Sequence, residues 1–209
     1  MVGRIIETPE DVAEGAAWLA AAEPRFAAAL EVTGPLPLRR RADGFATLLS
    51  AIVSQQVSVA AAAAIWRRLE AMGATEPAGL LAAGDEALRA AGLSRQKLAY
   101  GRAIAESGVD FAALRRMPDA EVVAALVRVK GVGVWTAEIY AMFSLGRADV
   151  FAPGDLALQE AARLVFELPL RPRERELRAM SLAWSPWRAV AARLLWAYYR
   201  AAKQREGVA

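Results

Sequence analysis

The chain has 209 residues, of which 56% are hydrophobic and 23% are charged, and this balance excludes an intrinsically disordered protein. It contains no cysteine and no histidine, which excludes disulfides, thiolate nucleophiles, the usual zinc sites and histidine acid-base catalysis. The net charge is +3, but residues 171–209 hold nine bases against three acids, so we expect a basic C-terminal face. Such a face is typical either of a solvated helix surface or of a protein with nucleic acid as its partner.

The N-terminal segment shows no targeting signal. Four acids, Glu7, Glu10, Asp11 and Glu14, stand where a signal peptide has a basic start and an apolar middle. No apolar run along the chain reaches the roughly 18 to 20 residues that span a bilayer. We therefore expect a soluble, cytoplasmic protein without a membrane partner.

Helix start signals recur along the chain and are followed by apolar residues at spacings of three and four. They occur at Thr8-Pro9, at Asp43, at Ser58 and at Ser185-Pro186. Strand-like alternation is almost absent. The pattern predicts an all-α protein of about ten to thirteen short helices. The expected breaks are Gly34-Pro35, Gly73, Gly92, Gly108, Gly131 to Gly133, Pro153-Gly154 and Pro169 to Pro172.

The segment 35–41 is the best candidate for a crossover between two lobes. It contains two prolines followed by three arginines, a composition typical of an exposed, extended connection.

Two amphipathic helices are predicted over residues 118–129 and 134–145, separated by Lys130-Gly131-Val132-Gly133. Two glycines around one hydrophobic residue allow a tight turn with positive φ and a close backbone approach to a partner. The amides at the start of the second helix then face outward, where they suit a phosphate. The alternative is an ordinary turn between helices with a glycine C-cap.

Asp155 follows Pro153-Gly154 and precedes a predicted helix over residues 156–166. It is either an N-cap or a functional carboxylate, and the two roles are compatible, because helix amides and the helix dipole stabilise an ionised carboxylate.

Four segments together carry a family resemblance. LVRVKGVGVWTAEIYAM resembles a helix-hairpin-helix element, and DVFAPGD resembles the Gly/Pro-rich loop and aspartate that follow it in the helix-hairpin-helix/Gly-Pro-Asp DNA glycosylase superfamily. LLSAIVSQQVSVAAAAAIWRRL is similar to that superfamily's early helix and lesion-side loop. WSPWRAVAARLLW is similar to the terminal helices of the 3-methyladenine DNA glycosylase II branch.

The resemblance implies two helical lobes with a cleft for DNA and the flipped base between them, near Asp155. Residues 43–150 form the central lobe, which contains the helix-hairpin-helix (about 118–145), and residues 1–42 and 151–209 form the other. It implies a short form without the N-terminal β domain of larger members.

The resemblance implies a hydrolase that removes alkylated bases of the 3-methyladenine type from duplex DNA and initiates base excision repair. Asp155 would stabilise the oxocarbenium-like sugar and assist the water. Members that also cleave the strand carry a lysine in the place of Trp135, so we expect no lyase activity. Two alternatives stay open: a lyase that uses Lys130, and a non-catalytic helix-hairpin-helix module that binds DNA.

Base recognition is expected from Trp135 and Trp196, which match pocket positions of the family. The alternative for Trp196 is a packing role in the core. Ile139 stands where the family often has a further aromatic residue, which suggests a roomier pocket. In the resemblance, Gln55 and Gln56 occupy the place of the residue that wedges into the base stack. The alternative is that they are polar caps at the C-terminus of a helix. The branch often carries an apolar side chain at the position of Gln56.

Four other tryptophans are assigned to packing. Trp184 and Trp187 are expected at the start of the last long helix, and Trp18 and Trp66 lie on apolar helix faces.

The hairpin is expected to grip a DNA phosphate through Lys130 and the amides near Gly131, Gly133 and Trp135. By resemblance, the backbone oxygens of Val127, Val129 and Val132 hold a monovalent cation, Na⁺ or K⁺, when DNA is bound. We expect no required cofactor, no obligate protein partner, a monomer, and a location on the nucleoid if the source is bacterial.

Overall fold

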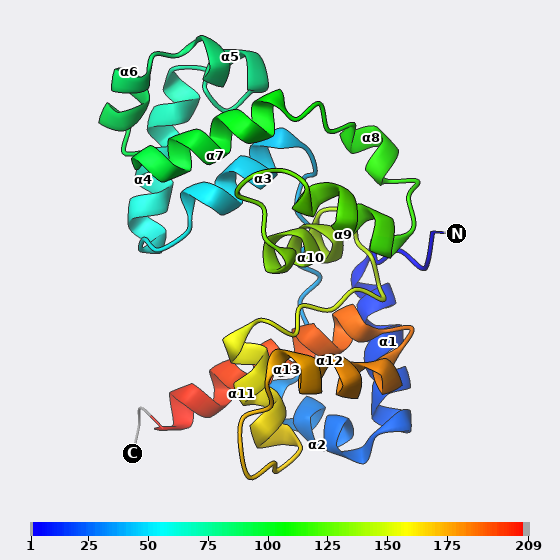
Figure 1. Cartoon of the computed structure of the whole chain (residues 1–209). Coiled ribbons are helices and arrows are strands. Elements are labelled where there is room, and N and C mark those ends of the chain that lie inside the picture. Colours follow the sequence, from blue (N-terminus) through cyan, green and yellow to red (C-terminus); the bar gives the residue numbers. More distant parts are fainter. Residues whose placement is uncertain (1, 207–209) are drawn as a thin grey trace. The chain divides into compact units, whose positions relative to one another are not determined.

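The structure is a computed structural model that describes residues 2–206, and Figure 1 shows its helices in chain order. The described residues form thirteen α-helices and one 3₁₀ helix, with an isolated β-bridge between Ile5 and Arg147. The prediction of an all-α fold is therefore confirmed. The helices are α1 (Pro9–Ala22), α2 (Pro24–Thr33), α3 (Phe45–Val53), α4 (Val59–Ala71), α5 (Pro77–Ala82), α6 (Asp85–Ala90), α7 (Arg95–Glu106), α8 (Phe111–Leu114), α9 (Asp119–Val127), α10 (Val134–Phe143), α11 (Leu156–Val165), α12 (Glu174–Met180), η1 (Ser181–Trp184) and α13 (Arg188–Glu206).

The chain divides into two compact units. The central unit contains residues 41–140, and the terminal unit contains residues 2–40 together with the chain from residue 141 onward. The sequence placed the second boundary at 150 rather than 140. The ten residues between these positions join the terminal unit because backbone hydrogen bonds tie them to the N-terminal segment. The Ile6 amide donates to the Gly146 carbonyl at 2.7 Å, and the Ala148 amide donates to the Arg4 carbonyl at 3.0 Å.

In the central unit, α7 packs against α3 and α5. The apolar face of α3 supplies Leu48, Leu49 and Ile52, all fully buried. Serine caps set the starts of the neighbouring helices: the Ser58 hydroxyl accepts a hydrogen bond from an amide of α4, and the Ser94 hydroxyl accepts one from an amide of α7. The lesion-side loop therefore lies between a buried helix and a well-capped one.

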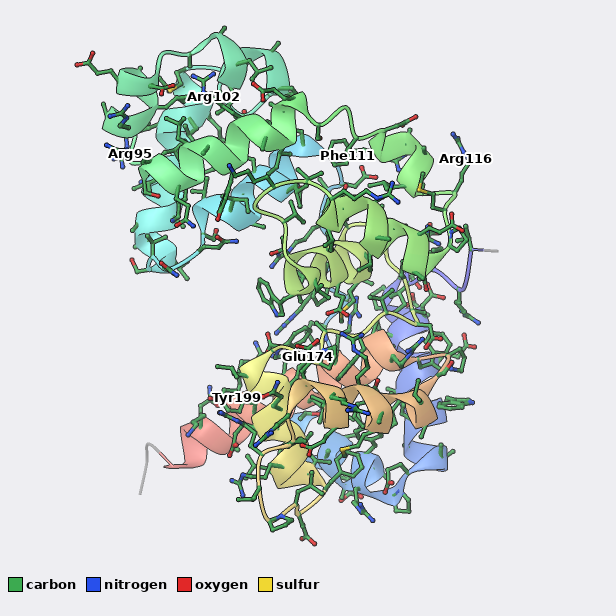
Figure 2. All side chains as sticks on the ribbon, in the orientation of Figure 1. Arg95, Arg102, Phe111, Arg116, Glu174 and Tyr199 are labelled. Atoms are coloured by element: carbon green, nitrogen blue, oxygen red, sulfur yellow. The ribbon has the colours of Figure 1, made fainter. Side chains whose placement is uncertain are left out.

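Tyr140, in α10, is buried in the central unit and anchors the start of α3. Its hydroxyl accepts a hydrogen bond from the Gly44 amide at 2.7 Å, and its ring centroid lies 6.2 Å from that of Phe111, which is labelled in Figure 2. Burial, the largest effect, raises the pKa of Tyr140 to about 12, although the Gly44 hydrogen bond opposes the shift.

In the terminal unit, α13 packs against α1, α2 and α11. Gly15 allows α1 to pack closely against Trp187, because a Cβ at this position would lie 2.6 Å from Cε3 of that tryptophan. Trp184 stacks on Phe166, with ring centroids 5.7 Å apart. Both Trp184 and Trp187 are buried, as the sequence predicted.

Two expectations about packing need revision. Trp18 is 38% exposed, so its prediction as a core residue is wrong, because its position on α1 turns away from the buried residues Gly15, Ala16 and Leu19. Trp66 is half-buried, and its Nε1 donates to Glu70 at 2.7 Å on the surface of α4. No helix within the described range is long and apolar enough to cross a membrane.

Candidate functional site

Asp155 caps the N-terminus of α11 from a closed turn. Its backbone amide donates to the Ala152 carbonyl at 3.1 Å. Its side-chain Oδ1 accepts hydrogen bonds from the amides of Ala157 at 2.9 Å and Leu158 at 3.1 Å. These amides lie at the positive end of the helix and stabilise a negative carboxylate. The predicted cap is therefore present, and the side chain is only half-buried.

Gln159 holds the backbone of the same turn. It lies one turn into α11, and its buried side-chain amide donates to the Pro153 carbonyl at 2.8 Å. This hydrogen bond satisfies a carbonyl that would otherwise be unpaired in a dry environment. Gln159 was not among the predicted site residues, because its partner is a backbone carbonyl.

Trp196, from α13, lies directly against Asp155. Its indole Nε1 donates to Asp155 Oδ1 at 3.2 Å, and its ring centroid lies 5.7 Å from that of Phe143 with an interplanar angle of 34°. The sequence grouped Trp196 with the base pocket. The structure adds a direct contact with the candidate catalytic carboxylate.

The hairpin between α9 and α10 uses its two glycines in different ways. Gly131 has a φ of +94°, and a Cβ there would lie 2.3 Å from Cγ of Tyr100. Gly133 does not have a positive φ, and a Cβ there would meet open space. The prediction of positive φ is confirmed for Gly131 and wrong for Gly133, because the turn needs only one left-handed residue. Gly133 lies on the exposed side of the turn, directly before the first residue of α10.

A hollow of about 770 Å³ lies between α3 and the first turns of α10, within the central unit. Trp135 and Ile139 line one side of it, and Trp135 is 43% exposed. The hollow is also lined by Thr47 and Ser50, which share one face of α3, and by Ser54, which directly follows that helix. The sequence analysis missed this hydroxyl stripe, whose signal is polar residues at spacings of three and four on a largely apolar helix.

Gln55 and Gln56 line this hollow and also a second one of about 480 Å³. Gln56 has a φ of +56°, a conformation that non-glycine residues rarely adopt. Backbone strain of this kind is often found at functional loops. The predicted wedge loop therefore has an unusual backbone conformation at Gln56.

The second hollow is lined by the hairpin, by the wedge loop and by the N-terminal part of α7. The hairpin contributes Lys130, Gly131 and Gly133, and α7 contributes Lys97. Lys97 Nζ donates to the carbonyl of Val53, the last residue of α3, at 2.8 Å. Burial lowers the pKa of Lys97. Lys97 thus braces the end of the helix that leads into the wedge loop, a contact that the sequence did not predict.

Among the described residues, no cluster of three or more aspartates and glutamates could hold a metal ion. Val127, Val129 and Val132 all line the second hollow. The Val129 carbonyl accepts a hydrogen bond from the Val132 amide at 3.0 Å, and a carbonyl oxygen keeps a second lone pair for another partner. Neutral backbone oxygens suit a hard cation.

The predicted site residues thus fall into two groups. The terminal unit brings Asp155 and Trp196 into direct contact. The central unit brings the wedge loop, Trp135 and Ile139 to one hollow, and the wedge loop and the hairpin to another. Each group is a coherent local structure.

Comparison with known proteins supports the family resemblance that the sequence motifs indicated. The family model described as HhH-GPD superfamily base excision DNA repair protein matches residues 49–188. A putative DNA-3-methyladenine glycosylase of Bacillus subtilis is 35% identical over 95 residues, which cover 46% of this chain and 33% of that protein. The chain therefore matches about a third of the length of this relative.

Two solved structures are similar over most of the chain. The DNA-3-methyladenine glycosidase of Bacillus halodurans is 33% identical, with a TM-score of 0.80 over 97% of this chain and 94% of that one. The 3-methyladenine DNA glycosylase of Schizosaccharomyces pombe, solved in complex with abasic DNA, is 26% identical, with a TM-score of 0.75 over 88% and 95%. The resemblance seen in the sequence is confirmed, and the chain belongs to the HhH-GPD superfamily of base excision DNA repair proteins.

Proposed function

We propose that the protein is a DNA glycosylase that hydrolyses the N-glycosidic bond of alkylated bases in duplex DNA, which is the first step of base excision repair. The observation that carries the proposal is the Asp155 carboxylate, held by two helix amides and an indole N–H in a chain of this superfamily. Its relatives named as 3-methyladenine glycosylases support the substrate class.

The reaction breaks the bond between C1′ of the sugar and a nitrogen of the base, and the electron pair leaves with the base. The sugar then carries positive charge, which the Asp155 carboxylate stabilises, and the oxygen of a water bonds to C1′ while its proton passes to the carboxylate or to solvent. An alkylated purine already carries a positive charge and departs as a neutral base. The reaction therefore needs no general acid, which agrees with a chain that has no histidine.

Base recognition is assigned to the larger hollow of the central unit. Trp135 offers an exposed indole face, and stacking of a cationic base on such a face contributes about 0.5 to 2 kcal/mol. Ile139 takes less space in the pocket than an aromatic ring. The base must first leave the duplex at a cost of a few kcal/mol. Gln55 and Gln56 are proposed to fill the gap that it leaves, since their loop borders the same hollow.

The hairpin is proposed to hold the DNA backbone. Open space beside Gly133 lets a phosphate approach the amides at the start of α10, and Lys130 adds an exposed positive charge. The carbonyls of Val127, Val129 and Val132 would hold Na⁺ or K⁺, which supplies positive charge for the phosphate. Such contacts bind DNA without reading its sequence.

The enzyme is proposed to act on the base alone, as a monomer, on cytoplasmic or nucleoid DNA. Trp135 stands where strand-cleaving members of the superfamily carry a lysine, and Lys97 and Lys130 line the smaller hollow instead. Borohydride reduction during turnover tests this point, because a lyase forms an imine that borohydride traps as a covalent adduct with DNA. A trapped adduct would show that a lysine takes part.

The test of the function is excision from methylated duplex DNA, with abasic sites converted to strand breaks by hot alkali. Wild type should form abasic sites on at least one alkylated substrate, and Asp155→Asn should be slower by about a hundredfold or more. Asparagine also caps helices well, so this variant should keep its fold.

Asp110→Asn is the matched control, since Asp110 caps α8 in the central unit by accepting the Ala113 amide at 2.9 Å. It should excise bases at the wild-type rate. Full activity of Asp155→Asn would remove Asp155 from the mechanism. DNA binding without any excision by wild type would favour the non-catalytic module instead.

A further inference from the structure

The surroundings of Asp155 suggest a role for Trp196 beyond contact with a base. Two helix amides and the Trp196 indole all donate to the same oxygen, Oδ1, at 2.9 to 3.2 Å. The two amides fix the carboxylate relative to α11, and the indole fixes it from α13. Three donors on one oxygen restrict rotation about the Cβ–Cγ bond, and so set the direction of the second oxygen, Oδ2.

The Trp196 ring packs against the ring of Phe143. The two rings are tilted by 34° with centroids 5.7 Å apart. A pair of aromatic rings at this separation contributes about 0.5 to 1.5 kcal/mol beyond the area that it buries. The indole therefore has little freedom to swing away from the carboxylate.

A buried arginine lies against the Phe143 ring. The guanidinium carbon of Arg193 lies 4.8 Å from the Phe143 ring centroid, and the side chain is 1% exposed. Its nitrogens donate to the Leu38 carbonyl at 3.0 and 3.2 Å and to the Ala189 carbonyl at 2.8 Å. No carboxylate pairs with it among the described residues, so the three hydrogen bonds and the ring offset the cost of burying the charge.

These contacts form a continuous series within the terminal unit, from the Leu38 carbonyl through Arg193, Phe143 and Trp196 to Asp155. We propose that Trp196 is a positioning residue that holds the Asp155 carboxylate in its working orientation, and that Phe143 and Arg193 hold Trp196 in place. The inference rests on the proposed function, because it concerns the same carboxylate.

A positioning role and a role as a wall of the base pocket predict different outcomes. A pocket wall contacts the base, so its loss changes the ranking of substrates. A positioning residue acts on the sugar-facing carboxylate, which is common to all substrates, so its loss slows every excision by a similar factor. The chemical rate should fall while DNA binding stays the same.

The experiment compares Trp196→Phe with Trp66→Phe. Both changes keep an aromatic ring and remove an indole N–H that donates to a carboxylate, but Trp66 donates to Glu70 on the surface of α4. Single-turnover excision is measured on three alkylated duplexes, together with the affinity for a duplex that contains an abasic site. We expect Trp196→Phe to be slower by about ten- to a hundredfold on all three, the loss typical of one hydrogen bond to a charged group, with unchanged affinity. Trp66→Phe should match wild type.

A double-mutant cycle isolates the pair. In an Asp155→Asn background, Trp196→Phe should cause a much smaller further loss, because the carboxylate that it positions is gone. A readout independent of activity is the indole ¹H–¹⁵N resonance of Trp196, identified by its disappearance in Trp196→Phe. It should move in Asp155→Ala, while the Trp66 resonance stays in place.

The outcomes separate two failures. Wild type that excises no base overturns the proposed function, and the inference falls with it. Wild type that is active, with Trp196→Phe either equally fast or slowed only on some substrates, overturns the inference alone. An indole resonance of Trp196 that does not respond to Asp155→Ala likewise shows that the hydrogen bond does not form in solution.

Discussion

Substitutions at the two hairpin glycines should have different effects, one on the stability of the fold and the other on the affinity for DNA. Gly131 has a φ of +94°, and an alanine methyl there would lie 2.3 Å from Cγ and 2.6 Å from Cβ of Tyr100. Gly133 does not have a positive φ, and an alanine methyl there would have no neighbour within 4 Å. We predict that Gly131→Ala lowers the free energy of unfolding, whereas Gly133→Ala and Gly133→Val lower the affinity for DNA.

The magnitudes follow from these contacts. Forcing an L-residue into the left-handed region costs about 1 to 2 kcal/mol. Overpacking against the Tyr100 ring adds about 1 to 3 kcal/mol, because neither the ring root nor the turn backbone can move far. Gly131→Ala should therefore lose about 2 to 5 kcal/mol, which in a protein of this size lowers Tm by roughly 5 to 15 °C.

Gly133→Ala should change stability by no more than about 0.5 kcal/mol. Its methyl group, however, occupies the space through which a phosphate reaches the amides of α10. Losing one hydrogen bond to a charged group costs about 1.5 to 3 kcal/mol, or about ten- to a hundredfold in affinity.

Thermal unfolding of the protein variants tests the predicted loss of stability. Fluorescence anisotropy with matched undamaged and abasic duplexes tests the predicted loss of affinity for DNA. Gly133→Val should weaken binding to the two duplexes by the same factor, because phosphate contacts carry no base information. A Tyr100→Ala change should recover the steric part of the loss in Gly131→Ala. The reasoning is refuted if Gly133→Ala unfolds as early as Gly131→Ala, or if Gly133→Val binds both duplexes as tightly as wild type.

Two further predictions concern the helices that frame the hollows. Lys97→Met should lower the free energy of unfolding in urea by about 1 to 2 kcal/mol, because the Val53 carbonyl loses its donor, and Lys97→Arg should lose less; equal stability of all three proteins would contradict the bracing role. The pKa of Tyr140 is raised from 10 to about 12, so its contribution to stability is complete below pH 10 and is lost as the pH rises through 12. Wild type should lose about 2 kcal/mol more than Tyr140→Phe over this range, measured by urea unfolding at each pH, and parallel pH curves would exclude that titration.

Much of the fold was predictable because its signals are local. Ser58 and Ser94 each cap the helix that follows, and Thr8 shares a capping box with Asp11. Such contacts span two or three residues, and the sequence displays them directly. The boundary at residue 140 was not predictable in this way. It depends on backbone pairing between residues 4–6 and 146–148, and backbone groups leave no mark in the sequence.

In the candidate site, too, the local contacts were predictable from the sequence and the distant contacts were not. The cap at Asp155 and the glycine turn could be predicted because their partners lie within a few residues. The contact of a side chain with an element far away in the sequence could not be predicted. Lys97 reaches Val53 across 44 residues, and Trp196 reaches Asp155 across 41. Neither pair has a spacing rule, because the separation depends on loops that can change in length without changing the contact.

Trp196 was assigned to the base pocket because it matches a pocket position of the family. An aromatic residue on an amphipathic helix serves packing and recognition equally well, and nothing in its neighbours separates the two. The indole of Trp196 has a single N–H donor, and in the structure this N–H donates to Asp155. Because the only N–H of the Trp196 side chain donates to the carboxylate, the ring face is the part of Trp196 that remains for contact with a base. Trp135, a residue that is 43% exposed and lines the larger hollow, is therefore the stronger candidate for stacking on the flipped base.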